Sequence, residues 1–326
     1  MTVDAQILAA LRNAEEGSIS GTELSQRLGI SRAAIRARIE ELRCLGYDIE
    51  ASPHTGYRLL GTPDVLHPDD LLSRLGKTKV VGRDVRVFQE TTSTNDVLER
   101  LARAGVKEGV VVFAESQTKG RGRLGRKWIS PPKKGLWFSV LLRPDLRPQA
   151  ATQLTIASAT ALCRAIREQT GLRPEIKWPN DILIRGKKVA GILTELSAEL
   201  DRVKNVVLGI GLDVNVTASE FPPEIRKLAT SLKIETGRTV ERAALAVAVL
   251  RELDFDYARI GAGKFDALAD EWEEQCTTIG KNVTLTVGER VIKGRAESLD
   301  EDGALLLRTQ HGHLERIIGG DVTLEK

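Results

Sequence analysis

The apolar and polar positions of the first 60 residues predict three helices followed by a short hairpin. Ser20, with Glu23 three residues later, forms a capping box that begins a helix ending at Gly29. Ser31 can cap the next helix at once, and two short apolar stretches separated by a turn containing Pro and Gly close the region. This order of elements is that of a winged helix-turn-helix in residues 1–62.

The helix expected after Ser31 has one apolar face and one basic face. Ile35, Ile39 and Leu42 fall at i, i+4 and i+7, so they face a core. We expect this helix to enter the major groove of DNA, where phosphate contacts supply most of the affinity. The expected DNA-binding residues are Ser31, Arg32, Arg36 and Arg38. The alternative is a protein-docking module, because residues 1–62 contain seven Arg against eight Asp or Glu.

Residues 63–275 combine stretches with the apolar pattern of strands and stretches with the apolar pattern of helices. They therefore predict an α+β core. Strands are expected at 80–90, 110–114 and 136–142, with helices at 150–169 and 241–259. Beyond them, Val283, Leu285 and Val287 alternate with polar residues, and glycines mark turns. We therefore expect a small antiparallel β-barrel in residues 276–326.

Composition narrows the class of protein. A hydrophobic content of 41% and a charged content of 29% are typical of a soluble globular chain. The first thirty residues lack a long apolar run, so we expect a cytoplasmic protein without membrane contact. A net charge of +3 does not by itself indicate nucleic-acid binding. Cys44, Cys163 and Cys276 lack metal-ligand spacing, so we expect no metal site or disulfide and three buried thiols.

The segment from Lys119 to Trp128, called the basic loop below, combines glycine with dense positive charge. Residues 119–134 contain seven Lys or Arg and no acid. Glycine lets the backbone approach a ligand closely, and guanidinium groups present forked donors that suit phosphate and carboxylate oxygens. We expect an anion site here; the alternative is a solvated basic loop or a nucleic-acid patch.

A second unusual segment is Lys177-Trp178-Pro179-Asn180-Asp181. A strand is expected to end at Trp178, where Pro and Asn turn the chain into a further apolar strand. After a hairpin turn, Lys188 lies within the returning apolar strand, and we expect its ammonium group to point inward. The alternatives are an Asx turn at Asn180 and Asp181 and an exposed hairpin position for Lys188.

At these segments the sequence resembles the biotin protein ligase family, in the branch that joins the ligase to a biotin-operon repressor. Thr92-Ser93-Thr94-Asn95-Asp96, Gln117 and Gly209-Ile210-Gly211 also match the family pattern. The resemblance covers essentially the whole chain. It implies an N-terminal winged helix-turn-helix (1–62), a mixed α/β catalytic domain of the biotin/lipoate ligase type (63–275) and a C-terminal SH3-like β-barrel (276–326).

The resemblance implies an enzyme that makes biotinyl-5′-AMP from biotin and ATP with Mg²⁺. The biotin would then pass to a lysine of the biotin carboxyl carrier protein of acetyl-CoA carboxylase, and the adenylate-bound homodimer would repress transcription at operator DNA. Implied biotin contacts are Ser93, Thr94, Asn95, Gln117, Arg121, Lys188, Gly191 and Gly209. Implied contacts to ATP or the adenylate are Arg123, Arg126, Trp128, Lys177, Asn180 and Asp181, with the last two on the magnesium side.

Gly120 and Gly211 complete the expected ligand-binding set. Attack of one anion on another needs cations that hold both in line, so Lys188, Arg123 and Arg121 are the expected catalytic residues.

Two positions depart from the family pattern. Asp213 places a carboxylate where the family has an amide on the nucleotide side, and it would either repel the triphosphate or ligate magnesium. Glu325 stands where the repressor-type ligase has an arginine. An alternative function is therefore a biotin- or adenylate-sensing repressor with little ligase turnover. A lipoate-type acyl ligase is disfavoured, because the strand motif and downstream histidine expected of that relative are missing.

Overall fold

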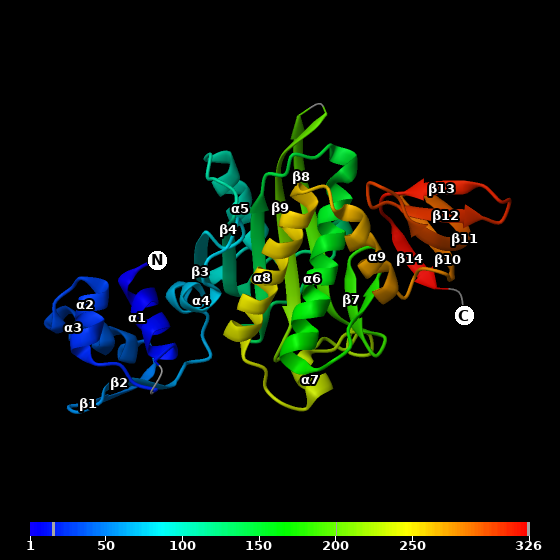
Figure 1. Cartoon of the computed structure of the whole chain (residues 1–326). Helices are drawn as coiled ribbons and strands as arrows, with labels where there is room; N and C mark the ends of the chain where they lie inside the picture. The colour runs from blue at the N-terminus through cyan, green and yellow to red at the C-terminus, as the bar shows by residue number, and fades with distance from the viewer. Residues whose placement is uncertain (15–16, 200, 325–326) are drawn as a thin grey trace. The chain divides into compact units, whose positions relative to one another are not determined.

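The structure of the chain is a computed structural model that describes residues 1–14, 17–199 and 201–324 (Figure 1). Its contacts divide the chain into two compact units, Met1–Lys77 and Thr78–Lys326. Each unit has its own core. None of the helices within the described ranges combines the length and apolar character needed to cross a lipid bilayer.

The first unit has the predicted winged helix-turn-helix order. Its elements are α1 (Val3–Arg12), α2 (Gly21–Leu28), α3 (Arg32–Cys44), the hairpin strands β1 (Asp48–Ser52) and β2 (Gly56–Gly61), and α4 (Pro68–Leu75). The side chains of Ser20 and Ser31 accept the backbone N–H groups of Glu23 and Ala34 at 3.0 and 3.2 Å, so both predicted N-caps are confirmed.

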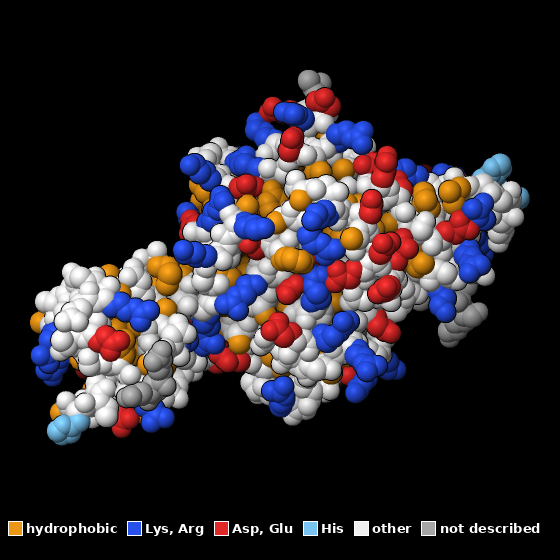
Figure 2. Space-filling model, in the orientation of Figure 1, with side chains coloured by type: hydrophobic (Ala, Val, Ile, Leu, Met, Phe, Trp, Pro, Cys, Tyr) orange, Lys and Arg blue, Asp and Glu red, His pale blue; other side chains and the backbone are white. Residues whose placement is uncertain are grey.

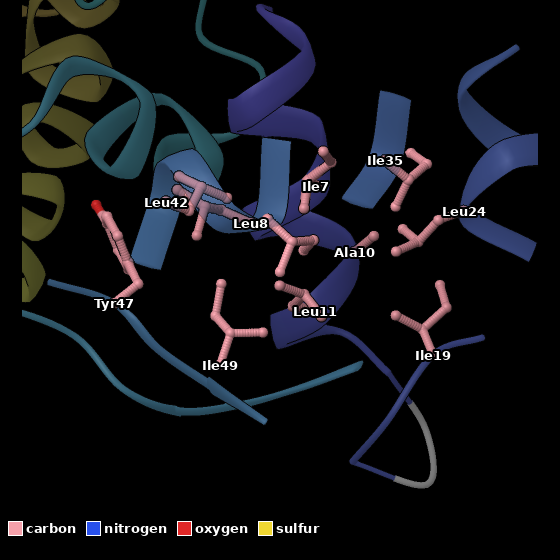
Figure 3. Packing of buried hydrophobic residues seen from close by; sticks show 11 residues of the cluster. Ile7, Leu8, Ala10, Leu11, Ile19, Leu24, Ile35, Leu42, Tyr47 and Ile49 are labelled. Atoms are coloured by element: carbon pink, nitrogen blue, oxygen red, sulfur yellow. The ribbon is translucent and has the colours of Figure 1, made fainter. Parts of the chain in front are cut away.

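The core of this unit is formed where α1, α2 and α3 meet the hairpin (Figure 3). Ile35, Ile39 and Leu42 are fully buried there, as their spacing predicts. Helix α4 packs against α1, and Asp70 of α4 forms an ion pair with Arg12. The domain boundary expected at residue 62 therefore lies inside the first compact unit, which continues through α4.

The second unit is built on a seven-stranded sheet. Its strands, in spatial order, are β3 (Asp84–Thr91), β4 (Val110–Gln117), β5 (Gly135–Leu142), β9 (Arg202–Asp213), β8 (Lys187–Glu199), β7 (Asp181–Ile184) and β6 (Glu175–Lys177). Only the β3–β4 pair among these is parallel. Helices α6 (Thr152–Thr170) and α8 (Arg242–Gly261) lie side by side across one face, and α5 (Thr94–Arg103) packs on the other (Figure 1).

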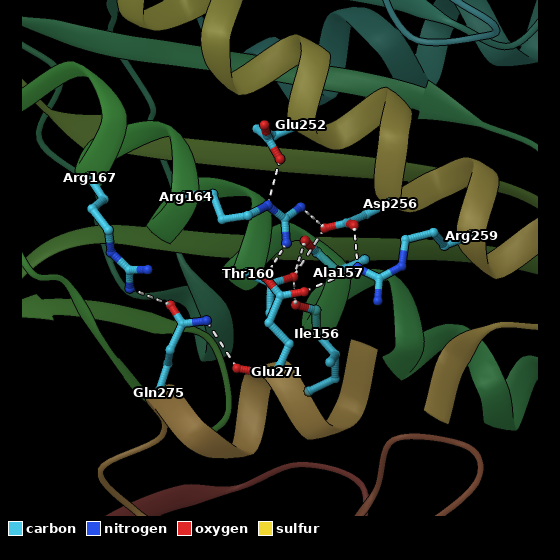
Figure 4. A network of polar contacts seen from close by, with 10 residues as sticks. All are labelled: Ile156, Ala157, Thr160, Arg164, Arg167, Glu252, Asp256, Arg259, Glu271 and Gln275. Atoms are coloured by element: carbon cyan, nitrogen blue, oxygen red, sulfur yellow. Dashed lines mark hydrogen bonds and ion pairs between the residues drawn. The ribbon is translucent and has the colours of Figure 1, made fainter. Parts of the chain in front are cut away.

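The helical layer is held together by a half-buried group of charges around the buried Asp256 (Figure 4). The Arg164 guanidinium of α6 lies 2.5 Å from carboxylates of Asp256 on α8 and Glu271 on α9 (Phe265–Gln275). Burial lowers the pKa of Arg164, but these acids outweigh it and raise the pKa above its ordinary value. The cation therefore stays charged and ties three helices together.

The C-terminal part of the second unit is a five-stranded antiparallel sheet. Its strands, in spatial order, are β13 (Leu314–Ile317), β12 (Leu305–Thr309), β11 (Arg290–Leu299), β10 (Asn282–Val287) and β14 (Asp321–Leu324). Val283 and Leu285 are fully buried, as the alternation predicts, and the α9 residue Glu273 accepts the N–H of Leu299 at 2.6 Å. The sheet is thus joined to the helical layer.

Two expectations were wrong in detail. The first strand begins at Asp84 rather than at residue 80, because the N–H groups of Lys79, Val80 and Val81 donate to the buried Asp254 carboxylate at 2.7–2.9 Å instead of to a strand. Cys44 is exposed, since it ends α3 two positions after the buried Leu42 and so leaves the apolar face.

On the face drawn in Figure 2, charged side chains of both signs are interspersed.

A fully buried ion pair joins the sheet to α8. Arg242 Nη1 lies 2.6 Å from Glu115 Oε2 of β4, and the two side chains are 1% and 2% exposed. Arg242 Nη1 also donates to the carbonyl of Gly135 at 3.3 Å. Removing one partner of such a pair leaves the other charge buried without compensation.

Arg242→Met is therefore expected to lower the free energy of unfolding by about 3–5 kcal/mol in a urea titration of the full chain. Arg103→Met is the control, because Arg103 and its partner Glu99 are 75% and 52% exposed and such pairs contribute at most about 1 kcal/mol. Equal effects of the two substitutions would contradict the assignment of Arg242 as a structural anchor.

Candidate functional site

The candidate site begins with a part of the sheet surface that carries no side chains. Strand alternation puts Gly209 and Gly211 of β9 on the face that α5 covers. A Cβ atom on Gly209 would lie 2.3 Å from Asn95 Oδ1, and one on Gly211 would lie 2.4 Å from the Trp128 indole. Gly191 of β8 is paired with Gly211 in the sheet. Asn95 and Trp128 therefore lie directly on bare backbone, which only glycine allows.

The start of α5 contributes a buried polar corner. Ser93, Thr94 and Asn95 are each 3% exposed. The N–H of Thr94 donates to Gln117 Oε1 at 2.9 Å, and its hydroxyl lies 2.7 Å from the Ser139 hydroxyl of β5. Ser93 is the N-cap residue, but its side chain makes no capping hydrogen bond. The sequence-predicted group at 93–95 is thus brought together with Gln117.

Asn95 connects this corner to β8. Its Oδ1 accepts a hydrogen bond from Ser139, and its Nδ2 donates to Glu195 Oε2 at 2.6 Å. Gln117 in turn donates from Nε2 to the Ser130 hydroxyl at 2.9 Å. The corner offers several donors and acceptors that are shielded from water, which is the arrangement that recognises a polar ring in a small ligand.

The basic loop folds back over this surface. The N–H of Trp128 donates to the carbonyl of Gly120 at 2.9 Å, and a Cβ atom on Gly120 would lie 2.5 Å from the Trp128 carbonyl. Together with the residues on either side of it, the loop lines a pocket of about 620 Å³. That volume is within the roughly 300–1,000 Å³ of small-molecule sites.

Acids from distant segments pair with two arginines of the basic loop. Arg121 forms ion pairs with Glu195 (2.8 Å) and with Asp96 of α5, and hydrogen bonding to Glu195 raises the pKa of Arg121. Arg126 pairs with Asp321 at the start of β14. The loop has no acid of its own, so these partners offset part of its positive charge in the folded chain.

Arg123 is more buried than its neighbours in the loop. Its Nη1 donates to Asn180 Oδ1 at 3.2 Å and to the Gly320 carbonyl at 3.3 Å. Burial lowers the pKa of Arg123, and the negative charges of Asp321 and Asp181 oppose that shift. The loop therefore contacts both the second predicted segment and the C-terminal sheet.

Lys188 lies at the centre of the candidate site. Its Nζ is 2.5 Å from Asp181 Oδ1 and 5.3 Å from the centroid of the Trp128 ring, a cation–π distance. The position of a Cβ atom on Gly191 would be 3.2 Å from the same Nζ. Lys188 thus points over the side-chain-free surface, as we expect from its place in an apolar strand.

The remaining residues of the second segment are fixed by backbone contacts. Asn180 donates from Nδ2 to the Ile192 carbonyl at 2.7 Å, and the Ile192 N–H donates to the Asn180 carbonyl at 3.0 Å. Lys177 ends β6 opposite Asp181 and is half-buried. The Trp178–Pro179 peptide bond is cis. Asn180 is therefore attached to β8 rather than forming an isolated turn.

Two groups at this surface have no hydrogen-bond or ion-pair partner among the residues that the structure describes. Asp213, the last residue of β9, is 5% exposed, and burial raises the pKa of its carboxyl well above the ordinary value although the Lys188 ammonium acts the other way. The indole Nε1 of Trp128 is buried and has no hydrogen-bond partner among the described residues. A ligand is the natural source of partners for both groups.

Sequence reasoning missed several residues of this site. Ser139 has a detectable signal, since it is a polar residue inside the apolar stretch 136–142. Asp96 belongs to the matched segment 92–96, but no contact is predicted for it from the sequence. Glu195 and Asp321 become neighbours of the basic loop only through the fold, and nothing local in the sequence indicates it. Glu325, the second departure from the family pattern, lies outside the described residues.

The predicted DNA-binding residues lie at the N-cap and in the first half of α3. Ser31 is its N-cap, and the side chains of Arg32 and Arg36 are exposed. Arg38 is also exposed but is paired with Glu41 at 2.8 Å and lies 3.8 Å from Asp4. The two arginines nearest the helix start are thus the freest to contact another molecule.

Three family models match consecutive parts of the chain. Residues 4–58 match an HTH domain, residues 87–213 the biotin/lipoate A/B protein ligase family, and residues 278–324 the biotin protein ligase C terminal domain. These matches cover the helix-turn-helix, the sheet with the candidate site and the C-terminal sheet.

Curated relatives match nearly the full length. The chain is 39% identical to the bifunctional ligase/repressor BirA of Bacillus subtilis, with 94% of each chain covered. It is 32% identical to that of Escherichia coli, with 99% of this chain and 97% of the relative covered.

Among solved structures, the biotin protein ligase of Aquifex aeolicus in complex with biotin and ATP covers 75% of this chain and 99% of its own, with 33% identity and a TM-score of 0.64. The chain belongs to the biotin protein ligase family, within its group of bifunctional ligase/repressors.

Proposed function

We propose that this chain forms biotinyl-5′-AMP from biotin and ATP, transfers the biotin to a lysine of a carrier protein, and represses transcription when the adenylate is bound. One observation carries the proposal. Four cations lie around one side-chain-free sheet surface, and each contacts an oxygen within the protein: Arg121, Arg123, Arg126 and Lys188. A carboxylate and a triphosphate that bind together can replace these internal oxygens as the partners of the four cations.

Biotin is proposed to lie on the Gly209 end of this surface. The hydroxyl and amide groups of the buried Ser93, Thr94 and Asn95 and of the half-buried Gln117 would recognise its ureido ring, since they offer both donors and acceptors. Its carboxylate would then point along β9 toward Gly211, where Lys188 lies over the open surface. Arg121, which is paired with Glu195 opposite Val207, would reach it from the Asn95 end.

ATP is proposed to occupy the Gly211 end, near Arg123, Arg126, Trp128, Lys177, Asn180 and Asp181. Mg²⁺ is usually bound by one or two carboxylates together with substrate phosphates. The described residues contain no cluster of three or more acidic, His or Cys side chains able to hold an ion alone. Asp181 with the Asn180 oxygen fits such an ion only in company with the triphosphate, and the ion would neutralise the departing pyrophosphate.

The residues act by holding two anions in line. The carboxylate of biotin attacks the α-phosphorus of ATP, and repulsion between the two is offset by Arg121, Arg123 and Lys188. Trp128, which packs against a buried cluster that includes Trp137, would cover the reacting centre and limit the entry of water. The amine of the carrier lysine then attacks the mixed anhydride, and AMP leaves.

The partners follow from this chemistry. The acceptor is proposed to be the biotin carboxyl carrier protein of acetyl-CoA carboxylase, which places the reaction in the cytoplasm. The first unit is proposed to bind operator DNA through the N-cap and first half of α3, which carry Ser31, Arg32, Arg36 and Arg38. A homodimer formed with bound adenylate would present two such units to two half-sites.

Lys188→Ala is expected to reduce biotin transfer to a carrier domain by about 10²–10³-fold, the usual cost of removing one preorganised charge. Transfer is measured with radiolabelled biotin and ATP. Lys187→Ala is the control, because the neighbouring Lys187 is exposed. Full transfer by the Lys188 variant would refute its catalytic role, and no transfer by the wild type would favour the sensor alternative.

Gly209→Ala is expected to weaken biotin binding roughly tenfold, because the new methyl group would displace Asn95 and leave its amide unpaired. Isothermal titration with biotin measures the effect. Gly261→Ala serves as the matched control, since a Cβ atom there meets nothing within 4 Å. Unaltered biotin affinity in the Gly209 variant would place biotin elsewhere.

Arg36→Ala is expected to weaken operator binding of the adenylate-bound protein. If Arg36 neutralises one phosphate, the slope of log K against log salt concentration should also become shallower by about 1. Titration of labelled operator DNA at several salt concentrations gives both quantities. Arg103→Ala, on an exposed side of α5, should bind as the wild type does. Equal binding by the two variants would argue against α3 as the recognition helix.

A further inference from the structure

Asp213 stands at the nucleotide end of the proposed site. It follows Gly211 by two positions on β9, so strand alternation puts it on the same sheet face as Gly209 and Gly211. Trp128 packs on Gly211, and Gly135 of β5 is paired with Asp213 in the sheet. On this face of β9, the Asp213 carboxyl is therefore the first side chain beyond Gly211. It lies next to the backbone that the Trp128 indole covers.

The other deeply buried acids of this unit are all partnered. Asp254 accepts three backbone N–H groups, Asp256 pairs with two arginines, and Glu115 pairs with Arg242. Asp213 has no hydrogen bond or ion pair from its side chain within the described part of the chain. An isolated carboxylate is too costly to bury, and such a group takes up a proton instead.

The charged groups around Asp213 are engaged elsewhere. The positive charge of Lys188 on β8 favours ionisation of Asp213. Its ammonium group, however, is 2.5 Å from the Asp181 carboxylate. Arg242 of α8, which contacts the Gly135 carbonyl, is paired with Glu115, and Lys134 before β5 lies 3.2 Å from Glu220.

On the remaining side, the α7 helix (Leu232–Thr236) is attached to the end of β9. Lys233 of α7 donates its backbone N–H to the Val214 carbonyl at 2.8 Å. The charged side chains on β8, on α8 and before β5 are thus already balanced by other acids, and burial decides the state of Asp213.

A protonated carboxyl has the hydrogen-bonding pattern of an amide. It presents one donor and one acceptor side by side. The edge of adenine presents the complementary pair, a donor at N6 and an acceptor at N7. An uncharged acid at this position also avoids repelling the triphosphate, which an ionised one would do.

We infer that Asp213 works as an uncharged carboxylic acid that hydrogen-bonds the adenine of ATP, so that nucleotide binding weakens when this acid ionises. The inference rests on the proposed function and deepens it. It replaces both roles considered for an ionised Asp213, repulsion of the triphosphate and ligation of magnesium, and it makes adenylate formation in this chain sensitive to pH.

The first experiment measures ATP affinity of the full chain by titration calorimetry across a pH series. Wild type should bind ATP with constant affinity at low pH and lose affinity as pH rises through the raised pKa of Asp213. Asp213→Asn keeps a donor and an acceptor but cannot ionise, so its profile should be flat. Asp213→Leu should bind roughly tenfold more weakly at low pH, as expected when a bidentate base contact is removed.

Asp145→Asn is the matched control, because that acid is 89% exposed, and its ATP profile should follow the wild type. A flat wild-type profile with normal ATP binding overturns this inference alone. Weaker ATP binding by Asp213→Asn than by wild type, confined to solutions with Mg²⁺, also overturns it in favour of magnesium ligation. No ATP binding by wild type at any pH overturns the proposed function as well.

A second experiment tests the protonation without nucleotide. A buried acid with a raised pKa is neutral when folded, so ionisation costs stability as pH rises. Wild type should therefore lose melting temperature relative to Asp213→Asn as pH rises above about 4, the ordinary Asp range. The difference should level off above the raised pKa. A difference that does not depend on pH would show that Asp213 is ionised throughout.

Discussion

The packing of Asn95 and Trp128 onto the bare backbone of Gly209 and Gly211 is the contact on which the candidate site depends. A sheet face without side chains leaves a shallow space that another element must cover. The start of α5 covers one end and the basic loop covers the other. Because both are fitted to the same strand, the polar corner near Asn95 and the cations of the loop are held at a fixed separation along β9.

Charge compensation is the second feature that shapes this surface. The loop concentrates positive charge that would repel itself if it were isolated. The fold supplies acids from α5, β7, β8 and β14, so the ligand-free site is neutralised locally. Ligand binding is therefore an exchange of internal acids for ligand anions. A ligand with a single weak anion gains little from such an exchange, whereas a carboxylate and a triphosphate together replace several partners at once.

Much of this architecture could be predicted from the sequence, because it follows from local rules. Ser20 and Ser31 are caps, Ile35, Ile39 and Leu42 keep a helical period, and Val283 and Leu285 alternate. The positions of the basic loop and Lys188 were also predictable, although their ligand roles stay proposals. The rest depends on contacts between distant segments.

Three features show why such contacts escape a reading of the sequence. The Asp254 carboxylate, which is far away in the sequence, accepts hydrogen bonds from the N–H groups of residues 79–81. The first strand of the sheet therefore begins later than its apolar pattern predicts. Glu195 and Asp321 meet the loop only after the sheets have formed. The state of Asp213 depends on burial and on the absence of partners within the described residues, and neither has a local pattern.

The contacts of Arg123 and Arg126 with Gly320 and Asp321 affect the order in which the parts of the chain can fold during synthesis. The first unit is complete at residue 77, so it can fold while most of the chain is still being synthesised. The basic loop cannot reach its final arrangement until Gly320 and Asp321 have left the ribosome. A nascent chain thus acquires its helix-turn-helix early and its ligand surface only after β14 has been made.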